Sequence, residues 1–129
     1  GGFDGETLEA YRNRMALMHS MQSGYTSIEA ALERLLELLG EQKPVGKDTH
    51  AALLRRFSKP LNGSRPALLN DALYRSLDEA RRFRHVARKS YDDLDMDRAK
   101  PALAAAMLIV AEIEQAMAAF RVALEQKRR

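Results

Sequence analysis

The chain has 129 residues, of which 30% are charged, and a formal net charge of +3. This length predicts one domain, and so small a net charge means that any nucleic-acid contact must come from local clusters. The absence of cysteine excludes disulfides, thiolate metal sites and cysteine nucleophiles. No apolar run approaches roughly 18 residues and no signal peptide is visible, so we expect a cytoplasmic protein without a membrane-spanning segment.

The first predicted helix extends from Asp4 to Gly40, and its apolar residues recur at steps of three and four with one gap at Gln22. Such spacing is typical of a helix that packs in a bundle. These apolar residues are Leu8, Tyr11, Met15, Met18, Tyr25, Ile28, Leu32, Leu35 and Leu39. Because methionine fills irregular gaps, the methionines here indicate core or dimer surface rather than a cofactor site. Gly40 is a natural C-terminal cap.

A second, short helix is predicted from Asp48 or Thr49 to about Phe57. His50 lies in its first turn, where a histidine is usually structural or merely exposed, and we expect no more of it. The segment that follows, as far as Pro66, holds two prolines and a glycine and is expected to be a loop.

The third predicted helix ends near Ser90, and the last helix starts nearer Asp97 than Asp92, because Pro101 suits only the first turn or so of a helix. The third helix has an apolar stripe of Leu69, Leu73, Leu77, Ala80 and Phe83. The last helix has a seam of Leu103, Met107, Val110, Ile113, Met117, Phe120 and Leu124.

No strand alternation persists anywhere in the chain. We therefore predict an all-α fold, a small antiparallel bundle of about four helices, two of them long, that forms one domain over residues 1–129. Gly1 and Gly2 are interpreted as a remnant of protein expression, which would leave the native N-terminus outside this sequence.

Five cationic side chains gather at the end of the third helix: Arg81, Arg82, Arg84, Arg88 and Lys89. Arg81, Arg84 and Arg88 share one helix face by their spacing, and Tyr91 continues that face. A charge run of this kind is often just a solvated basic face. The alternative is an anion site for a polyphosphate backbone, because arginine suits bidentate contact with phosphate.

This basic stretch resembles the signature of HepT-like ribonuclease toxins of the HEPN superfamily, in which Arg is followed by four residues, His, one residue and Tyr. Arg84 and Tyr91 occupy the Arg and Tyr positions, whereas Lys89 stands at the His position. The segments Leu32–Leu39 and His50–Arg56 are also similar to the family, the second through its His-x-x-Leu-Leu pattern. The resemblance extends over most of the chain and implies the HEPN-like fold.

The resemblance implies a homodimeric, metal-independent endoribonuclease without a cofactor, acting on RNA such as tRNA. It also implies a partner, the MNT-type nucleotidyltransferase antitoxin of type VII toxin–antitoxin systems, which transfers AMP onto the motif tyrosine. In these terms Arg84 stabilises phosphate, Lys89 occupies the acid/base position and Tyr91 is the modified switch. The expected contacts to the RNA backbone are Arg81, Arg82, Arg88 and His85. The structural alternative for Tyr91 is a half-buried side chain that closes the helix end.

Lys89 departs from the family pattern in a way that bears on catalysis. A lysine ordinarily titrates at about 10.4 and is a poor base at neutral pH, so we expect this chain to cleave RNA slowly or not at all. His85 could substitute, although on a regular helix it points about 100° away from Arg84.

The alternative function is a non-catalytic, dimeric helical module that binds a protein partner or RNA through the basic helix. Metal catalysis is poorly supported, because the three histidines lack the spacing of metal ligands.

Overall fold

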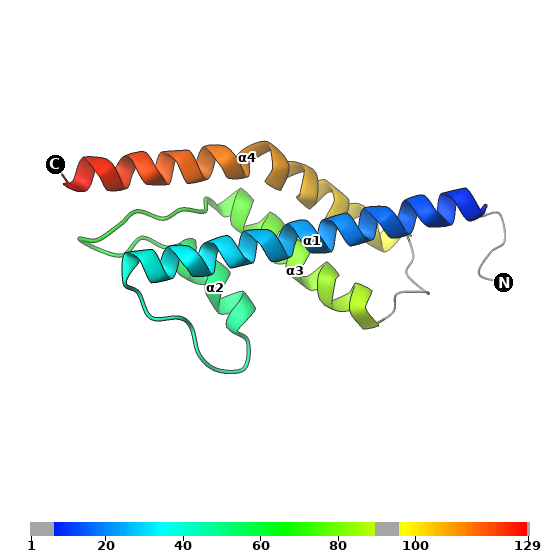
Figure 1. Cartoon of the computed structure of the whole chain (residues 1–129), viewed down its shortest axis with the longest axis horizontal. Coiled ribbons are helices and arrows are strands. Elements are labelled where there is room, and N and C mark those ends of the chain that lie inside the picture. The colour runs from blue at the N-terminus through cyan, green and yellow to red at the C-terminus, as the bar shows by residue number, and fades with distance from the viewer. Residues whose placement is uncertain (1–6, 90–95, 129) are drawn as a thin grey trace.

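We describe residues 7–89 and 96–128 of a computed structural model, with side chains throughout except at Arg14, 85–89, 96–99 and Arg128. This part of the chain forms four helices: α1 (Leu8–Leu39), α2 (Thr49–Phe57), α3 (Asp71–Lys89) and α4 (Met96–Arg128). α3 runs opposite to the long helices α1 and α4, and α2 lies against α3 and the C-terminal half of α1 (Figure 1). The predicted all-α bundle with two long helices is confirmed.

The ends of α1 are set by capping residues. The hydroxyl of Thr7 accepts a hydrogen bond from the backbone N–H of Ala10 at 3.1 Å, so α1 begins at Leu8 and not at the predicted Asp4. Gly40 ends the helix as predicted, with a φ of 72° that favours glycine.

The two helices that follow also start at side-chain caps. Asp48 accepts from the N–H of Ala51 at the start of α2, as predicted, and Asn70 accepts from Leu73 at 2.8 Å at the start of α3. Leu69 therefore precedes α3 and is not its first apolar residue, although it is buried as the sequence predicted.

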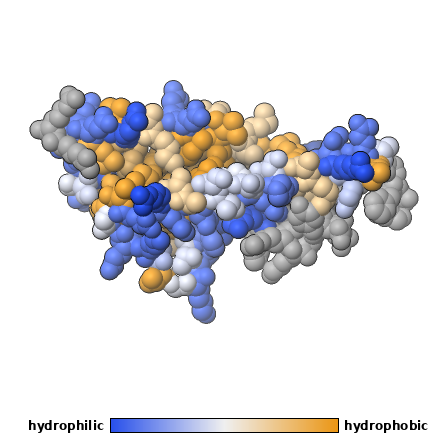
Figure 2. All heavy atoms as spheres, in the orientation of Figure 1, coloured by the Kyte–Doolittle hydropathy of each residue, from blue (hydrophilic) through white to orange (hydrophobic). Residues whose placement is uncertain are grey.

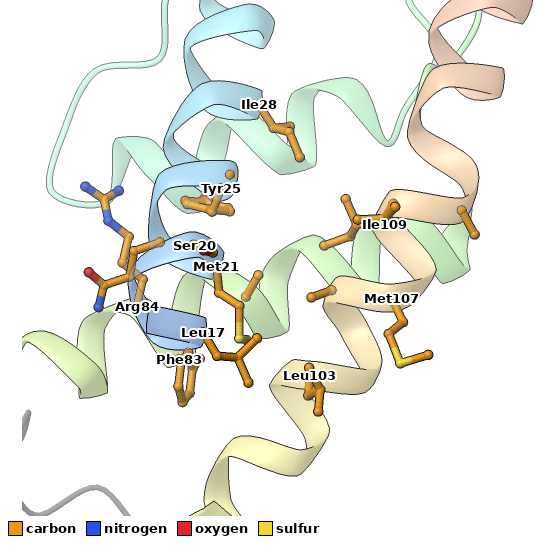
Figure 3. Close-up of a pocket in the computed structure, with 16 residues that line it drawn as sticks. Leu17, Ser20, Met21, Tyr25, Ile28, Phe83, Arg84, Leu103, Met107 and Ile109 are labelled. Atoms are coloured by element: carbon orange, nitrogen blue, oxygen red, sulfur yellow. The ribbon is translucent and has the colours of Figure 1, made fainter. Parts of the chain in front are cut away.

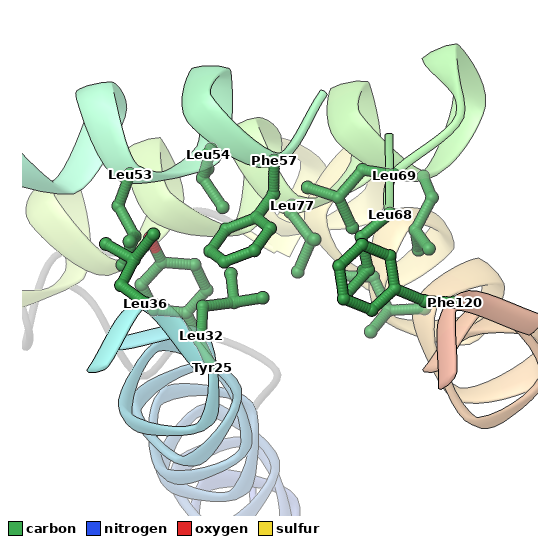
Figure 4. Close-up of a cluster of buried hydrophobic side chains, with 12 residues drawn as sticks. Tyr25, Leu32, Leu36, Leu53, Leu54, Phe57, Leu68, Leu69, Leu77 and Phe120 are labelled. Atoms are coloured by element: carbon green, nitrogen blue, oxygen red, sulfur yellow. The ribbon is translucent and has the colours of Figure 1, made fainter. Parts of the chain in front are cut away.

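The main core lies where α1, α2, α3 and the second half of α4 meet (Figure 4). Phe57 at the end of α2 is fully buried, and its ring meets that of Phe120 edge-on at 6.4 Å. Further members of this core are Tyr25, Leu32, Leu36, Leu53, Leu54, Leu68, Leu69, Leu73, Leu77 and Ile109. The predicted apolar stripe of α3 is thereby confirmed at Leu73 and Leu77.

A second, smaller core cluster joins the other end of the bundle. Met18 of α1, Phe83 of α3 and Ala102 of α4 are buried together, with Met15 and Met21 packed against them. The α1 methionines therefore belong to the core, which is one of the two roles predicted for them, core or dimer surface. Leu8 is an exception to the predicted seam and is 66% exposed, because the first turns of α1 project past the other helices (Figure 1).

The predicted seam of α4 is wrong in its first half. Met107 and Val110 are 68% and 77% exposed, whereas the small residues Ala102 and Ala105 and the nearby Ile109 are buried. The small residues allow α4 to approach α3 closely, and this packing turns the larger side chains away from the core. α4 thus keeps an apolar face that the described residues do not cover.

Length and composition alone would allow one helical stretch of the described chain, Lys100–Lys127 in α4, to cross a membrane, with a mean hydropathy of 1.6. No such stretch is expected from the sequence, because Glu112 interrupts the run of apolar residues. Apolar side chains gather along α4 and beside α1 on the face shown in Figure 2. A bundle helix with one apolar face meets the same criterion, so the stretch is weak grounds for a membrane segment.

Candidate functional site

The predicted basic stretch lies on the C-terminal half of α3. The structure describes its side chains at Arg81, Arg82 and Arg84. Four predicted site side chains lie outside the described residues: His85, Arg88, Lys89 and Tyr91. The complete three-residue motif therefore stays a prediction, and the geometry around its first member can be given in detail.

Arg81 and Arg82 are engaged by acidic side chains of their own helix. Arg81 donates a hydrogen bond from Nε to Oδ1 of Asp78 at 3.0 Å, and its Nη2 forms an ion pair with the same oxygen at 2.8 Å. Asp48 lies 3.9 Å from Nη1 of Arg81. Burial opposes its charge, but the hydrogen bonds and attraction from Asp78 outweigh that cost and raise the pKa of Arg81. Arg82 is more exposed and faces Asp78 at 3.5 Å and Glu79 at 3.3 Å. These two arginines match the solvated basic face more closely than a free anion site.

Arg84 has a different setting. Its guanidinium carbon lies 5.8 Å from the centre of the Tyr25 ring on α1, within the range of a cation–π contact (Figure 3). Among the described residues no carboxylate forms an ion pair or hydrogen bond with Arg84. A guanidinium that lies over an aromatic ring keeps its N–H donors available, because they point outward in the guanidinium plane. Arg84 is therefore held in place and can still bind an anion.

Tyr25 and Glu29 occupy successive turns of α1 and are both buried, at 4% and 7% exposure. Burial raises the pKa of the Tyr25 hydroxyl well above its ordinary value, and the negative charge of Glu29 raises it further. The positive charges of Arg81 and Arg84 oppose this effect, and Arg84 lies over the Tyr25 ring itself. The predicted common face of α3 is supported for these two arginines.

Glu29 is paired with His50 from α2. The Nδ1 atom of His50 and Oε1 of Glu29 are 2.5 Å apart, although the residues are 21 positions apart in sequence. Glu29 is buried while the His50 side chain is 55% exposed, so the pair connects the interior to the surface. The second oxygen of Glu29 and the Tyr25 hydroxyl have no hydrogen-bond partner within the described part of the chain.

An apolar groove of about 500 Å³ lies between α1 and α4, with α3 as its floor (Figure 3). Arg84 and Tyr25 stand at its edge beside the aliphatic part of the lining. The apolar side chains that line it include Leu17, Met21, Ile28, Phe83, Leu103, Met107, Ile109 and Val110. The groove is where the exposed apolar face of α4 meets the first half of α1.

Glu29 is not among the predicted site residues, and His50 is expected from the sequence to be only structural or exposed. One signal was available, because Glu29 follows Tyr25 by four residues and so shares the buried face of α1. The pairing with His50 depends on how α2 returns against α1, which no local pattern specifies. Within residues 7–89 and 96–128, no three His, Asp or Glu side chains come together as metal ligands would.

The chain matches a protein-family model. A family model described as HepT-like protein matches residues 16–124, which is most of the chain and includes all of the arginines discussed above. No curated protein and no solved structure matches the chain.

Proposed function

The chain belongs to the HepT-like family of the HEPN superfamily, and on that premise we propose that it is a toxin subunit that cleaves RNA, such as tRNA, without a metal ion. Catalysis is assigned to Arg84, Lys89 and Tyr91 at the three motif positions. A cytoplasmic location goes with such a substrate.

The observation that supports this proposal most is the setting of Arg84. Its guanidinium is oriented by the Tyr25 ring and lacks a carboxylate partner among the described residues. A preorganised cation without an internal counter-ion is suited to stabilise charge that develops on a phosphate. Arg81 and Arg82, which are already paired with acidic groups, would contact the RNA backbone less strongly.

In the proposed reaction the RNA 2′-hydroxyl attacks the adjacent phosphorus. A bond forms between phosphorus and the 2′ oxygen, and the bond to the 5′ oxygen breaks. A base takes the 2′ proton, the 5′ oxygen gains a proton, and the products are a cyclic phosphate and a 5′ hydroxyl. Arg84 would stabilise the negative charge on the non-bridging oxygens as the attack proceeds.

Lys89 stands where the family has its acid/base histidine. A protonated lysine can stabilise phosphate but cannot accept the 2′ proton at neutral pH. We therefore expect cleavage to be slow in this chain, and faster when the motif histidine is restored.

The test is cleavage of total tRNA in the presence of a metal chelator. Lys89→His should cleave measurably faster than the unmodified chain, because it restores the acid/base group at the motif position. Adding Arg84→Ala to Lys89→His should remove at least about 100-fold of that rate. Arg75→Ala is the matched control, because Arg75 is 77% exposed at the other end of α3. Intact RNA with every variant would contradict the proposal.

The resemblance also leads us to propose a homodimer, in which a second copy covers the groove between α1 and α4. Met107 and Val110 are large apolar side chains exposed at this groove. Contiguous apolar surface of this kind usually marks an interaction site. Two copies would bring two sets of arginines near one RNA strand and double the local positive field.

The proposed partner is an MNT-type nucleotidyltransferase antitoxin that transfers AMP to Tyr91. The added phosphate places negative charge beside the arginines of α3, where the RNA phosphate would bind. Repulsion and bulk would then prevent RNA from entering.

A second candidate function is a non-catalytic interaction module. It is favoured by Lys89 at the motif position and by the internal pairing of Arg81 and Arg82 with acidic side chains. Such a module would bind RNA or protein and leave RNA intact even as the Lys89→His variant, so the cleavage test separates the two functions.

A further inference from the structure

His50 and Glu29 form an arrangement common to histidines that transfer protons. Glu29 is fixed in the interior of α1, and its Oε1 lies 2.5 Å from Nδ1 of His50. A carboxylate at Nδ1 favours the tautomer with the proton on that nitrogen, which leaves Nε2 unprotonated and able to accept a proton. Nε2 forms no hydrogen bond within the described part of the chain, and the side chain is 55% exposed.

The pair lies on the same side of the bundle as the arginines of α3. Tyr25, one turn before Glu29 on α1, carries the guanidinium of Arg84 over its ring. Asp48, which caps α2 two residues before His50, lies 3.9 Å from Arg81. α1, α2 and α3 thus bring an imidazole, its carboxylate partner and two guanidinium groups to one surface, with Tyr25 and Asp48 between them.

A purely structural role accounts poorly for the exposure of His50. Burying a carboxylate costs several kcal/mol unless it is paired, so Glu29 needs a partner. A structural partner would itself be expected in the interior, as Arg65 is for Glu41. The His50 side chain is instead 55% exposed, and Asp48, which caps the same helix, lies 3.9 Å from Arg81.

We propose that His50, oriented by Glu29, is the base that takes the 2′ proton during RNA cleavage, in place of the motif histidine that Lys89 replaces. The proton moves from the 2′ oxygen to Nε2 as the bond to phosphorus forms. The electron pair of the broken bond stays on the 5′ oxygen, which takes a proton from water. His50 then returns its proton to solvent. This inference rests on the proposed function and assigns it a residue outside the family motif.

The test measures tRNA cleavage in the presence of a metal chelator by the chain that carries Lys89. His50→Asn is the variant of choice, because its amide nitrogen can replace Nδ1 as donor to Glu29 while Nε2 is lost. It should lower the cleavage rate at least about 100-fold. His19→Asn is the matched control, on the exposed side of α1, and should leave the rate unchanged. Circular dichroism verifies folding, and His50→Gln replaces His50→Asn if that variant unfolds.

Glu29→Gln tests the positioning role. It should lower kcat and leave KM nearly unchanged, because Nδ1 loses the carboxylate that holds its proton, whereas a structural role would change only the melting temperature.

The outcomes separate this inference from the function on which it rests. If Lys89→His cleaves RNA but the chain with Lys89 does not, the proposed function stands and His50 is not its base. Equal rates for His50→Asn and His19→Asn also overturn the inference. If every folded variant leaves RNA intact, the proposed function fails and the role of His50 fails with it.

Discussion

Arg81 and Arg84 are three residues apart on one helix, yet their guanidinium groups differ in electrostatic setting. Arg81 is held by Asp78 and faces Asp48, so much of its charge is balanced within the protein. Arg84 rests on an aromatic ring, which orients it without neutralising it. Arg81 and Arg84 cannot be told apart by their sequence context, yet we expect them to contribute differently to phosphate binding.

Tyr91 provides the prediction at the residue scale. Incubating the protein with an MNT-type nucleotidyltransferase antitoxin and ATP should increase its intact mass by whole AMP units, with Tyr91 as the acceptor. Tyr91→Phe should remove the increase, and Tyr74→Phe, which changes a partly buried tyrosine of α3 packed against the core, should keep it. A mass increase that persists in Tyr91→Phe would rule out Tyr91 as the sole site.

At the scale of elements, the connection between α2 and α3 is ordered by one buried cation. Arg65 is 2% exposed and donates to both oxygens of Glu41, at 2.6 and 3.2 Å. It also donates to the carbonyls of Lys59, Pro66 and Arg56, and its guanidinium lies 5.0 Å from the Phe57 ring. This loop, expected from its prolines and glycine, is thus attached to the end of α1 and supports the position of α2.

Arg65→Met should lower the free energy of unfolding by about 3 kcal/mol, because Glu41 loses its nearest cation and, among the described residues, keeps only Arg56 at 3.5 Å, and three carbonyls lose their donor. Urea denaturation measures the loss. Arg75→Met serves as the control, since the pair of Arg75 with Asp71 is exposed and should add little stability. A change in Arg65→Met no larger than in the control would contradict the assigned role.

The pair of Arg65 and Glu41 also predicts how the stability of the protein changes at acidic pH. The hydrogen bond from Arg65 holds the pKa of Glu41 below its ordinary value. A depressed pKa means that the carboxylate stabilises the folded state above about pH 4.5, and that this contribution is lost as pH falls further through the folded pKa. Arg65→Met should therefore show a smaller loss of unfolding free energy between about pH 5 and pH 3 than the unmodified chain.

At the scale of the whole molecule, the bundle leaves the groove between α1 and α4 open. α4 packs on α3 through alanines in its first half and on the main core through Phe120 in its second half. This arrangement leaves Met107 and Val110 exposed beside α1. A second copy of the chain would remove that surface from water and place two basic helices within one assembly.

Val110→Glu should weaken the proposed homodimer at least tenfold, which corresponds to about 1.4 kcal/mol, by placing a charge in the apolar contact. Sedimentation equilibrium measures the dissociation constant. Val122→Glu is the control, because Val122 is 47% exposed on α4 and does not line the groove. A monomeric unmodified chain, or equal dissociation constants for the two variants, would count against this surface.

The accuracy of the sequence predictions varied with how local their cause was. The caps at Gly40 and Asp48 and the stripe from Leu73 to Phe83 were predictable, because hydrogen bonding at helix ends and helical periodicity act within a few residues. The α4 seam was mispredicted because that helix is apolar on more than one side. Periodicity alone could not decide which side would face α3.

The sequence by itself determined the helical content, the apolar faces of α2 and α3, the family and the position of the basic stretch, since each depends on neighbours along the chain. Only the tertiary structure decided that Arg84 lies over the Tyr25 ring, that Asp48 comes within 3.9 Å of Arg81, and that Glu29 meets His50. These contacts join helices far apart in sequence. Their geometry depends on how α1, α2 and α3 pack, and that packing is set by all of the core side chains together.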